Sequence, residues 1–400
     1  MCTRVAYYAL RRSNSLGQAV LGGVESVTRL QIREVRSARD RESFARAGRL
    51  LHHGTPQFVP PLDREVADYI DPKKNPFFAE ADVEHFLATR DGEVVGRIAA
   101  VVEHRYVARF GKLGWFGWFD CVNDVEVARA LLERAESWLR AAAMQRVEGP
   151  YSYDATQEFG LLTAGFDQVP ALLQPHHESY YLDLVRSCGY EPRFGTRTYS
   201  WGAEDAAAME AVRRRGEAVL DRGELTVRSF DKRHAQRDID LLWDLFLATF
   251  SEQHDMLPMT RRMFDWQFAA MRPFVDPRLI RIVELQGRPV AFSFLVADAN
   301  EVLAHAGGRP GVSFYLRYPL LRRRVSGAVI LMIGVLPGME GTGAGRVLGA
   351  QIADVALGRV RPYRQVHTTW IHEENQASLT LVGRTGSPPR RTYTVVGKDL

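Results

Sequence analysis

From residue 30 onward, stretches in which apolar residues recur every second position alternate with stretches in which they recur every three or four positions. The first pattern is typical of strands and the second of amphipathic helices. Region 125–143 shows the helical period, with apolar side chains at Val127, Leu131, Ala135 and Leu139. The alternation predicts an α/β class and argues against a helical bundle or an all-β sandwich.

The predicted elements follow one layout twice along the chain. Asp91-Gly92, between strand-like segments 84–89 and 94–103, supplies the positive φ angles of a tight hairpin turn, and Gln286-Gly287 joins 280–285 to 289–297 in the same way. Further strands are expected at 31–35, 146–149, 226–230, 329–336, 365–371 and 391–396, and further helices at 40–53, 238–250, 345–356 and 375–382. The order of elements is repeated although the amino-acid sequence is not, which predicts two domains.

The charged, Ala-rich region 203–224 lies between the two repeats and is interpreted as a connecting segment. The predicted domains are therefore 30–202 and 225–400. Residues 1–29 contain arginines but no apolar core of signal-peptide length, and they are interpreted as a flexible extension whose place in the native protein stays open.

Composition narrows the class of protein further. Of the 400 residues, 46% are hydrophobic and 25% charged, so the chain can bury a core and is neither disordered, collagenous nor a coiled coil. No window approaches the ~18 uninterrupted apolar residues of a membrane span. Cys2, Cys121 and Cys188 have no close spacing, which indicates neither a disulfide framework nor a zinc site and suits a reducing cytoplasm.

The 52 basic residues exceed the 48 acidic ones by four and are interleaved with them. The chain therefore lacks the long basic stripe of a nucleic-acid-binding protein. A small ligand that carries phosphate is compatible with this balance.

The most informative segment is the apolar strand 330–337 and the glycine-rich turn after it, with Gly338, Gly341, Gly343 and Gly345 ahead of an apolar helix. Glycines let consecutive amides converge on an anion, and the first turn of the helix adds further free amides. The turn therefore favours a pyrophosphate, although such turns also serve as plain tight connections. The Gly-Lys-Ser/Thr of a Walker loop is missing.

At this turn the sequence resembles the GNAT superfamily of acyl-CoA-dependent acyltransferases. Gly343 and Gly345 occupy the glycine positions of the superfamily's pyrophosphate motif, and Glu340 stands at its Gln/Arg position. Segment 370–375, Trp-Ile-His-Glu-Glu-Asn, extends the resemblance. Over residues 30–400 the chain is similar to bacterial tandem-GNAT proteins, through the segments 56–61, 71–78, 95–100, 149–150 and 160–166.

The resemblance implies two tandem GNAT-like domains, each a mixed, mostly antiparallel sheet flanked by helices. It also implies an N-acyltransferase that uses acetyl-CoA or another acyl-CoA, without a metal, to acylate an amine of a small metabolite or lipid precursor. No nucleic-acid partner is expected, and the oligomeric state stays open.

The cofactor residues are implied by the same resemblance. In the superfamily the fourth strand bulges and separates from the fifth, so that the pantetheine arm pairs with its edge; here that edge is 333–336, with Gly334 as a natural place for the bulge. The implied cofactor-binding residues are Gly334, Val335, Leu336, Gly341, Gly343, Ala344, Gly345, Arg346 and Asn375.

The first domain differs at the equivalent position. Segment 119–126 places Asp120, Asp124 and Glu126 at a helix start and has no glycine. Carboxylates cap a helix well but repel phosphate. We therefore expect a degenerate first domain that shapes a substrate cleft, and a second domain that holds the cofactor.

The general base and acid are less clearly indicated. Many superfamily members use a Tyr six residues after the helix-opening Asn as the thiolate's proton donor, and that position is Leu381. Each remaining candidate also has a structural explanation, as a helix-start acid or a packed core residue. The candidate catalytic residues are Glu373, Glu374, His367 and Tyr393.

Acceptor contacts in the superfamily commonly come from two zones, which here contain His254 and Asp255 and, in the first domain, His176 and Tyr180. Adjacent histidines on a strand point to opposite sides, so His176 and His177 are not expected to hold a metal.

Two alternative functions stay open. A Fem-type transferase also pairs two GNAT-like domains but takes aminoacyl groups from tRNA, which the scattered charge and segment 341–345 disfavour. A non-catalytic acyl-CoA-binding protein, or one that has lost its ligand, is suggested by Leu381 and Glu340.

Overall fold

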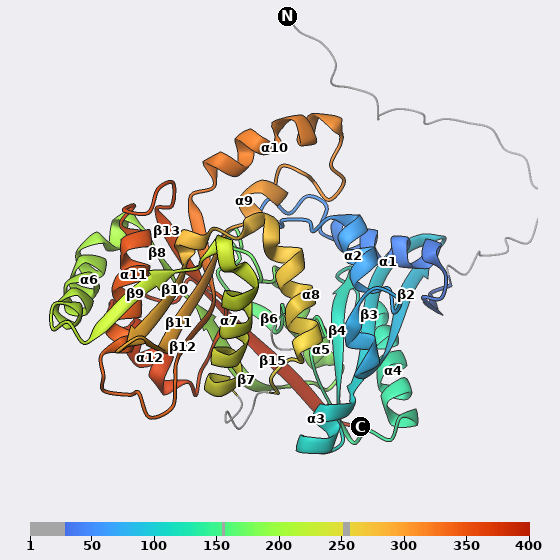
Figure 1. Cartoon of the computed structure of the whole chain (residues 1–400). Helices are drawn as coiled ribbons and strands as arrows, with labels where there is room; N and C mark the ends of the chain where they lie inside the picture. The colour runs from blue at the N-terminus through green and yellow to red at the C-terminus, as the bar shows by residue number, and fades with distance from the viewer. Residues whose placement is uncertain (1–28, 154–156, 251–256) are drawn as a thin grey trace, which may run out of the picture.

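The computed structural model describes residues 29–153, 157–250 and 257–400. In these residues the strands form two sheets, and helices pack on both faces of each sheet (Figure 1). The mixed α/β class predicted from the sequence is confirmed. The described strand pairs are antiparallel except β4–β5 and β12–β13, so each sheet contains one parallel pair.

The first sheet is built mainly from the first half of the chain. In order across the sheet its strands are β1 (Gln31–Glu34), β2 (Ala81–Arg90), β3 (Glu93–Glu103), β4 (Leu113–Cys121), β5 (Arg146–Gly149), β15 (Arg391–Asp399), β7 (Glu191–Thr198) and β14 (Ile371–His372), and β6 (Leu161–Ala164) also pairs with β15.

The second sheet is built mainly from the second half. In order, its strands are β8 (Ser200–Trp201), β13 (Gln365–Thr368), β12 (Gly327–Val335), β11 (Arg288–Ala297), β10 (Ile280–Leu285) and β9 (Leu225–Ser229).

The helices are distributed over both domains. They are α1 (Ala38–Leu51), α2 (Asp63–Tyr69), α3 (His104–Phe110), α4 (Val125–Ala141), α5 (Tyr181–Ser187), α6 (Ala206–Leu220), α7 (Ala235–Phe250), α8 (Arg261–Met271), α9 (Asn300–Leu303), α10 (Val312–Arg324), α11 (Ala344–Ala356) and α12 (Gln376–Gly383), with 3₁₀ turns at Pro76–Ala79, Ala203–Asp205, Lys232–His234, Arg272–Phe274 and Pro277–Leu279. Among the described residues, none of these helices combines the length and apolarity needed to cross a membrane.

The alternation of side chains along β11 assigns the two faces of the second sheet. Phe292, Phe294 and Val296 pack in one hydrophobic cluster with α7 and α8, whereas Ala291 and Leu295 pack with residues of α11. Successive residues of a strand point to opposite faces, so α7 and α8 cover one face and α11 the other. The first sheet is covered in the same way by α4 on one face and α1 on the other.

The two domains exchange strands, and the sheet boundary does not follow the sequence boundary. The final strand β15, expected to close the second domain, lies instead between β5 and β7 in the first sheet, while β8 from the first half pairs with β13. The predicted connecting region 203–224 contains α6, which packs on α11 so closely that a Cβ on Gly216 would lie 2.4 Å from the Arg346 carbonyl oxygen.

The predicted strand 365–371 is divided between the two sheets. Its first part, β13, pairs with β12, whereas β14 pairs with β7 of the first sheet. The segment is therefore not one continuous strand, because Thr369 and Trp370 lie between the two sheets.

Both hairpin turns are confirmed. Asp91 and Gly92 have φ values of 55° and 84°, and Gln286 and Gly287 have 51° and 79°. These are the left-handed conformations that a two-residue turn between twisted strands requires.

A buried carboxylate joins the two halves of the chain. Asp298, which follows β11, accepts hydrogen bonds of 3.0 Å from the amides of Leu172 and Asn300. Burial outweighs these bonds and raises the pKa of Asp298 from its usual 3.8 to about 7. The protonated form is therefore the one that the folded protein favours.

This pKa predicts a pH-dependent stability. Because the folded-state pKa lies above the unfolded one, the contribution of Asp298 is fully present below pH 3.8 and is lost as pH rises towards 7. Asp298→Asn, which keeps an uncharged acceptor, is expected to reduce the loss of stability between pH 5 and 8, by on the order of a few kcal/mol. Urea unfolding at pH 5 and pH 8 measures the free energy of unfolding of the two proteins. An equal pH dependence in both would contradict the raised pKa of Asp298.

Candidate functional site

The parallel pair of the second sheet separates part-way along its length. β12 and β13 are paired from Gly327 to Ile330, where Ile330 lies opposite Thr368, and beyond that point β13 leaves for the other sheet. The register of β12 on β11 shifts at the same place, so that Leu331 is an extra residue. This is a β-bulge, and it leaves the edge of β12 open from residue 331 onward.

The sequence suggested a bulge at Gly334, but the bulge is at Leu331. A Cβ on Gly334 would lie 2.7 Å from the Thr249 Cγ2 of α7 and 2.9 Å from the Phe292 ring. Glycine is therefore required at this position by the close approach of α7, which the sequence pattern could not distinguish from a bulge.

Backbone direction shows which amides face the opening. The Leu336 amide donates to the Val290 carbonyl of β11 over 2.8 Å, and Gly334 lies opposite Phe292 in the same register. Because amides alternate in direction along a strand, those of Ile333 and Val335 face the open side. Of the predicted edge residues, Val335 directs its amide to the open side, whereas Gly334 and Leu336 direct theirs into the sheet.

The glycine-rich turn leads from this edge into α11. Gly343, with φ of 93°, caps the helix, and the first bond of the helical ladder runs from the Val347 amide to the Gly343 carbonyl over 3.0 Å. Thr342 Oγ1 accepts from the Ala344 amide over 3.3 Å. The amides of Gly345 and Arg346 precede the ladder and have no partner among the described residues, so they are available to an anion.

The surroundings of the turn are open. A Cβ on Gly341 would meet no atom within 4 Å, and the Arg346 and Glu340 side chains are exposed and make no ion pair within the described part of the chain. Glu340 therefore does not fold over the amides of the turn.

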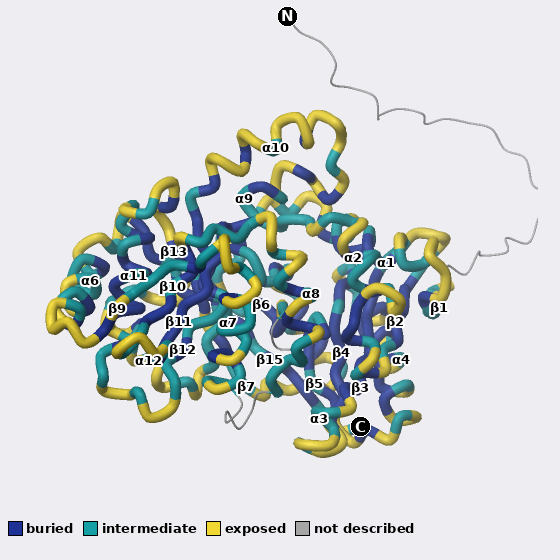
Figure 2. The backbone as a smooth tube through the Cα atoms, in the orientation of Figure 1, coloured by how far each residue is buried: buried dark blue, intermediate teal, exposed yellow. Residues whose placement is uncertain are grey.

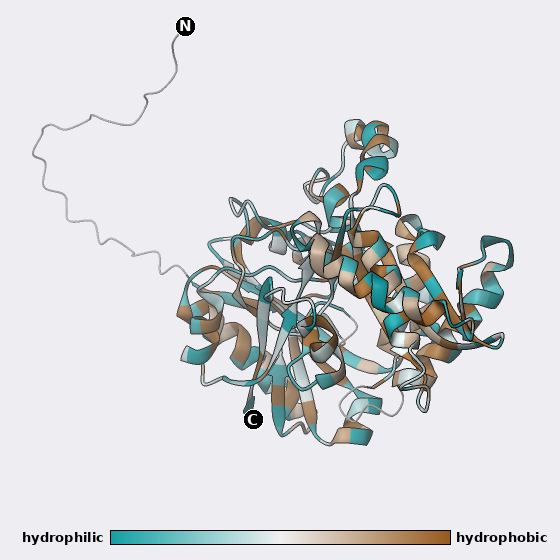
Figure 3. Ribbon diagram, turned by 90° about the vertical axis from the view of Figure 1, so that its left-hand side faces the viewer, coloured by the Kyte–Doolittle hydropathy of each residue, from teal (hydrophilic) through white to brown (hydrophobic). Residues whose placement is uncertain are grey.

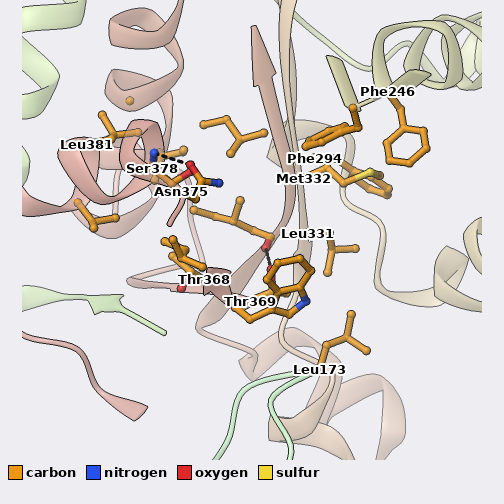
Figure 4. A pocket seen from close by; sticks show the side chains of 18 of the residues that line it. Leu173, Phe246, Phe294, Leu331, Met332, Thr368, Thr369, Asn375, Ser378 and Leu381 are labelled. Atoms are coloured by element: carbon orange, nitrogen blue, oxygen red, sulfur yellow. Dashed lines mark hydrogen bonds between the residues drawn. The ribbon is translucent and has the colours of Figure 1, made fainter. Parts of the chain in front are cut away.

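An apolar cavity of about 240 Å³ passes through the opening beside β12. On one face of the sheet its walls come from α7, α8, β11 and Met332, and on the other from α11, α12 and α6. Figure 4 shows Phe246, Phe294 and Met332 on one side of the strand and Ser378 and Leu381 on the other. The cavity thus connects the two faces of the sheet at the bulge.

Helix α12 supplies the polar groups of this cavity. Asn375 caps the helix by accepting from the Ser378 amide over 3.0 Å, which leaves its own side-chain nitrogen without a partner in the described residues. The Ser378 hydroxyl also lines the cavity and has no hydrogen-bond partner there. Leu381, one turn further, presents an apolar side chain at the position of the expected tyrosine.

A second, more polar cavity of about 780 Å³ lies between the two domains. It shares Met259, Trp370 and Asn375 with the apolar cavity, so the two spaces adjoin. Half of its lining residues come from the first domain, including Trp115 and Tyr151. The carboxylates that line it are Glu80, Glu103, Glu148, Glu373 and Glu374, and the guanidinium groups are Arg105 and Arg193.

Glu148, on β5, is one of three lining carboxylates that the sequence analysis missed, together with Glu80 and Glu103. Glu80 is bound by Thr260 and Arg105, and Glu103 accepts from the Tyr106 amide at the start of α3. Glu148 makes no hydrogen bond or ion pair within the described residues, and burial raises the pKa of its carboxyl. It is therefore poised to accept a proton or to bind an ammonium group.

The four predicted catalytic residues are not brought together. Glu373 accepts from the Gly195 amide over 2.7 Å, and it and Glu374 are exposed at the edge of the polar cavity. His367 bonds Ser200 over 2.7 Å, and burial lowers its pKa to about 4, but it lines neither cavity. Tyr393 lies in β15 of the first sheet, away from both cavities.

Two of the predicted acceptor residues, His176 and Tyr180, make hydrogen bonds within the first domain and its sheet. His176 Nδ1 accepts from Arg391 over 3.1 Å, and the Tyr180 hydroxyl donates to the Cys121 carbonyl over 2.9 Å. Neither lines either cavity. His254 and Asp255 lie outside the described residues. In the described part of the chain no cluster of three or more His, Cys, Asp or Glu side chains could hold a metal ion.

The equivalent opening in the first domain is filled by the chain itself. β4 and β5 also separate, after Trp115 and Glu148, but the segment after β5 lies against β4, so that a Cβ on Gly117 would lie 1.6 Å from the Tyr151 carbonyl oxygen. The following helix is capped by Asp124, whose carboxylate pairs with Arg90 at 2.8 Å. Within its described residues, this domain offers neither an open edge beside β4 nor free helix-start amides to a cofactor.

Comparisons with known proteins agree with this architecture. No protein-family model matches the chain. A bacterial ceramide synthase from Caulobacter vibrioides is 27% identical over 381 residues, which cover 93% of this chain and 98% of that protein. Protein YghO from Escherichia coli is 25% identical over 375 residues, or 92% of this chain and 95% of YghO.

Two solved structures share the fold over nearly their whole length. A tandem GNAT protein from the clavulanic acid biosynthesis pathway, without acetyl-CoA, has a TM-score of 0.53 at 12% identity and covers 93% of this chain and 98% of its own. A GCN5-related N-acetyltransferase from Sphaerobacter thermophilus has a TM-score of 0.50 at 14% identity, with coverage of 92% and 95%. The chain therefore has the tandem GNAT fold, and the resemblance found in the sequence is confirmed at the level of fold.

Proposed function

We propose that this protein is an acyl-CoA-dependent N-acyltransferase that joins a long acyl chain to the amine of a lipid-like acceptor. The observation that carries the proposal is the open edge of β12, which has the glycine-rich turn at one end and the apolar cavity beside its bulge. A thioester laid along this edge would have its phosphates at the turn and its acyl chain in the cavity.

The second domain supplies the groups that acyl-CoA requires. The amides of Gly345 and Arg346 would receive the pyrophosphate at the helix start, where the helix dipole favours negative charge. The outward amides of Ile333 and Val335 would pair with the pantetheine arm as a neighbouring strand does. The Asn375 side chain stands where the arm would enter the apolar cavity.

The character of the cavity supports long-chain substrates. Its walls on the α7 and α8 side are mostly phenylalanine and methionine side chains, with Gln267 as the polar residue of α8, and they offer an acyl chain extensive dispersion contacts. The description of the Caulobacter relative as a ceramide synthase is consistent with this, since ceramide is the amide of a fatty acid and a long-chain amino alcohol.

The reaction balances with the groups present. The neutral amine nitrogen attacks the thioester carbonyl carbon, a C–N bond forms, and the C–S bond breaks. Glu148 first takes a proton from the acceptor's ammonium group, directly or through water, which gives this neutral amine. The second proton that the nitrogen loses as the amide forms passes to the leaving thiolate through solvent or by relay through the Ser378 hydroxyl. Glu148 needs its raised pKa for this role, because an ordinary glutamate is a weak base near neutral pH.

A non-catalytic acyl-CoA-binding protein is the second candidate. It is favoured by Leu381, which removes the phenol that superfamily members commonly use as a proton donor. The two candidates share the binding residues and differ in whether thiol is released.

The test is a panel of acyl-CoAs from acetyl to palmitoyl, each with a short amine and with sphinganine, read by melting temperature and by free-thiol release. We expect thiol release with long-chain donors in the presence of sphinganine. A rise in melting temperature without release would favour the non-catalytic candidate, and no rise with any donor would contradict acyl-CoA binding.

Met332→Trp tests the place of the acyl chain. Met332 lies beside Phe294 on the α7 face of the sheet, so the larger side chain would shorten the cavity there. Overpacking of this kind costs ~1–3 kcal/mol, which predicts a loss of roughly five- to 150-fold in kcat/KM for palmitoyl-CoA and little change for acetyl-CoA. Met332→Leu is the matched control, and an equal loss for both donors would contradict the assignment.

A further inference from the structure

Helix α10 projects from the body of the molecule and is exposed along much of its length (Figure 2). Seven large hydrophobic side chains are exposed in the described residues, and four of them lie on this helix. They are Val312, Tyr315, Leu316 and Leu320, with exposed fractions of 77%, 63%, 79% and 51%. Such a concentration is unusual for a surface that faces only water.

The exposed side chains form one continuous stripe. Their spacing of three, four and eight residues from Val312 places them on the same side of an α-helix. Phe314 and Leu321, on the opposite side, are each only 9% exposed and pack into the second domain. The helix thus has an inward apolar face that anchors it and an outward apolar face with nothing described against it.

Arginines border the outward stripe. Arg317, Arg322, Arg323 and Arg324 are all exposed, and none of them makes an ion pair with a carboxylate in the described part of the chain. Segment 309–324 contains no acidic residue. Figure 3 shows hydrophilic and hydrophobic residues side by side on this projecting helix.

The projection is fixed at its base. Arg309, ahead of α10, pairs with Asp63 of the first domain at 2.7 Å, and the Gly308 carbonyl accepts from the Asp63 amide over 2.9 Å. On its inward side, Phe314 shares a hydrophobic cluster with Trp201 and Ile352, which line the apolar cavity. The stripe is therefore held in a defined position relative to the cavity.

We propose that the outward face of α10 docks this protein on an anionic membrane surface. Leucine, valine and tyrosine side chains would enter the boundary between headgroups and acyl chains, and the bordering arginines would contact lipid phosphates. Tyrosine suits that boundary because one end of its side chain is apolar and the other polar.

Charge favours a membrane over a second copy of the chain. A two-fold dimer through this face would bring the same arginines of both copies together, and those arginines have no acidic side chain within 309–324 to pair with. An anionic bilayer supplies the missing negative charge. The inference is independent of the proposed acyl transfer, although a lipid-like acceptor would be encountered at such a surface.

The test is co-sedimentation of the full-length protein with vesicles of phosphatidylcholine, with and without phosphatidylglycerol. We expect binding to the vesicles that contain phosphatidylglycerol, weakened by added salt. Leu316→Ser and Leu320→Ser should each reduce vesicle affinity about ten-fold. Replacing Arg322, Arg323 and Arg324 with Gln should reduce it by roughly five-fold for each charge removed.

Matched controls separate the stripe from general hydrophobicity and charge. Leu50→Ser removes a leucine of α1 that is 51% exposed, the same fraction as Leu320, and Arg214→Gln with Arg215→Gln removes exposed charge from α6. We expect both controls to bind vesicles as the wild type does. All variants should keep the wild-type melting temperature, because the substituted side chains are exposed.

Three outcomes would overturn the proposal. The first is no sedimentation with either vesicle, and the second is an equal loss of binding in the α10 variants and the α1 and α6 controls. The third is a dimer in sedimentation velocity that the Leu316→Ser and Leu320→Ser variants abolish, which would assign the stripe to a second copy. Thiol release measured in the absence of vesicles tests acyl transfer separately.

Discussion

Gly345→Asp is expected to abolish the rise in melting temperature that acyl-CoA produces, while the free protein keeps or slightly raises its own melting temperature. Position 345 lies in the first turn of α11, where a carboxylate stabilises a helix. A Cβ there would meet only the Val335 Cγ2 at 3.7 Å, an ordinary contact. The substitution therefore acts on ligand binding and not on folding.

The size of the effect follows from electrostatics. A carboxylate about 4 Å from a phosphate costs about 4 kcal/mol at an effective dielectric constant of about 20, or roughly a thousand-fold in affinity. A ligand at 100 times its dissociation constant raises stability by ~2.7 kcal/mol, so a loss of this size removes the shift entirely. Differential scanning fluorimetry with and without acyl-CoA measures both quantities.

Gly345→Ala is the control, because it adds the Cβ without the charge, and it should retain most of the shift. The same test at Gly343 would be ambiguous: its φ of 93° disfavours any side chain, and a Cβ would lie 2.6 Å from Val219 of α6. If Gly345→Asp kept the wild-type shift, the pyrophosphate would have to bind elsewhere.

Local sequence patterns predicted the second domain well where the structure depends on neighbours in the chain. The apolar run 330–337 and the glycines after it gave the correct strand, turn and helix start, because backbone conformation there is determined by residue type. The Asp91-Gly92 and Gln286-Gly287 hairpins were found for the same reason.

Contacts between distant segments were not predictable in this way. The amino-acid sequence of β15 does not show that this strand pairs with β5 and β7, because strand propensity specifies no partner. The division of 365–371 into β13 and β14, and the packing of α6 on α11, depend equally on tertiary structure. The repeated order of elements predicted a domain boundary in the sequence, but the exchanged strands pair across that boundary.

The candidate site shows the same division. The anion-binding amides follow from a local motif, whereas the polar cavity is assembled from both domains, so a search near segment 370–375 could find Glu373 and Glu374 but not Glu148. The one available signal was the short strand 146–149, in which Glu148 is the single carboxylate in an otherwise buried-looking segment.

Glu148→Gln is expected to lower kcat for acyl transfer by about 10²- to 10⁴-fold, the usual contribution of a general base. The amide keeps the shape of the side chain and cannot accept the amine proton. Because Glu148 makes no hydrogen bond or ion pair within the described residues, its replacement should leave folding intact, and removing a carboxylate that burial destabilises should not lower the melting temperature. Acyl-CoA binding, which depends on the other domain, should also be unchanged.

The pH profile distinguishes a base from a residue that only shapes the cavity. Burial raises the pKa of Glu148, so the wild-type rate should rise with pH as this carboxyl deprotonates and then level off, with the rise above the range of an ordinary glutamate. Without the base, only amine that is already neutral reacts, and with an amine pKa near ~10 the variant's rate should increase about ten-fold per pH unit through neutrality. Glu374→Gln, at the exposed edge of the same cavity, is the matched control and should keep the wild-type profile. If the Glu148→Gln variant kept the wild-type rate and the wild-type plateau, another group would have to be the base. Removing the carboxylate that accepts the proton must change both the rate and the pH profile.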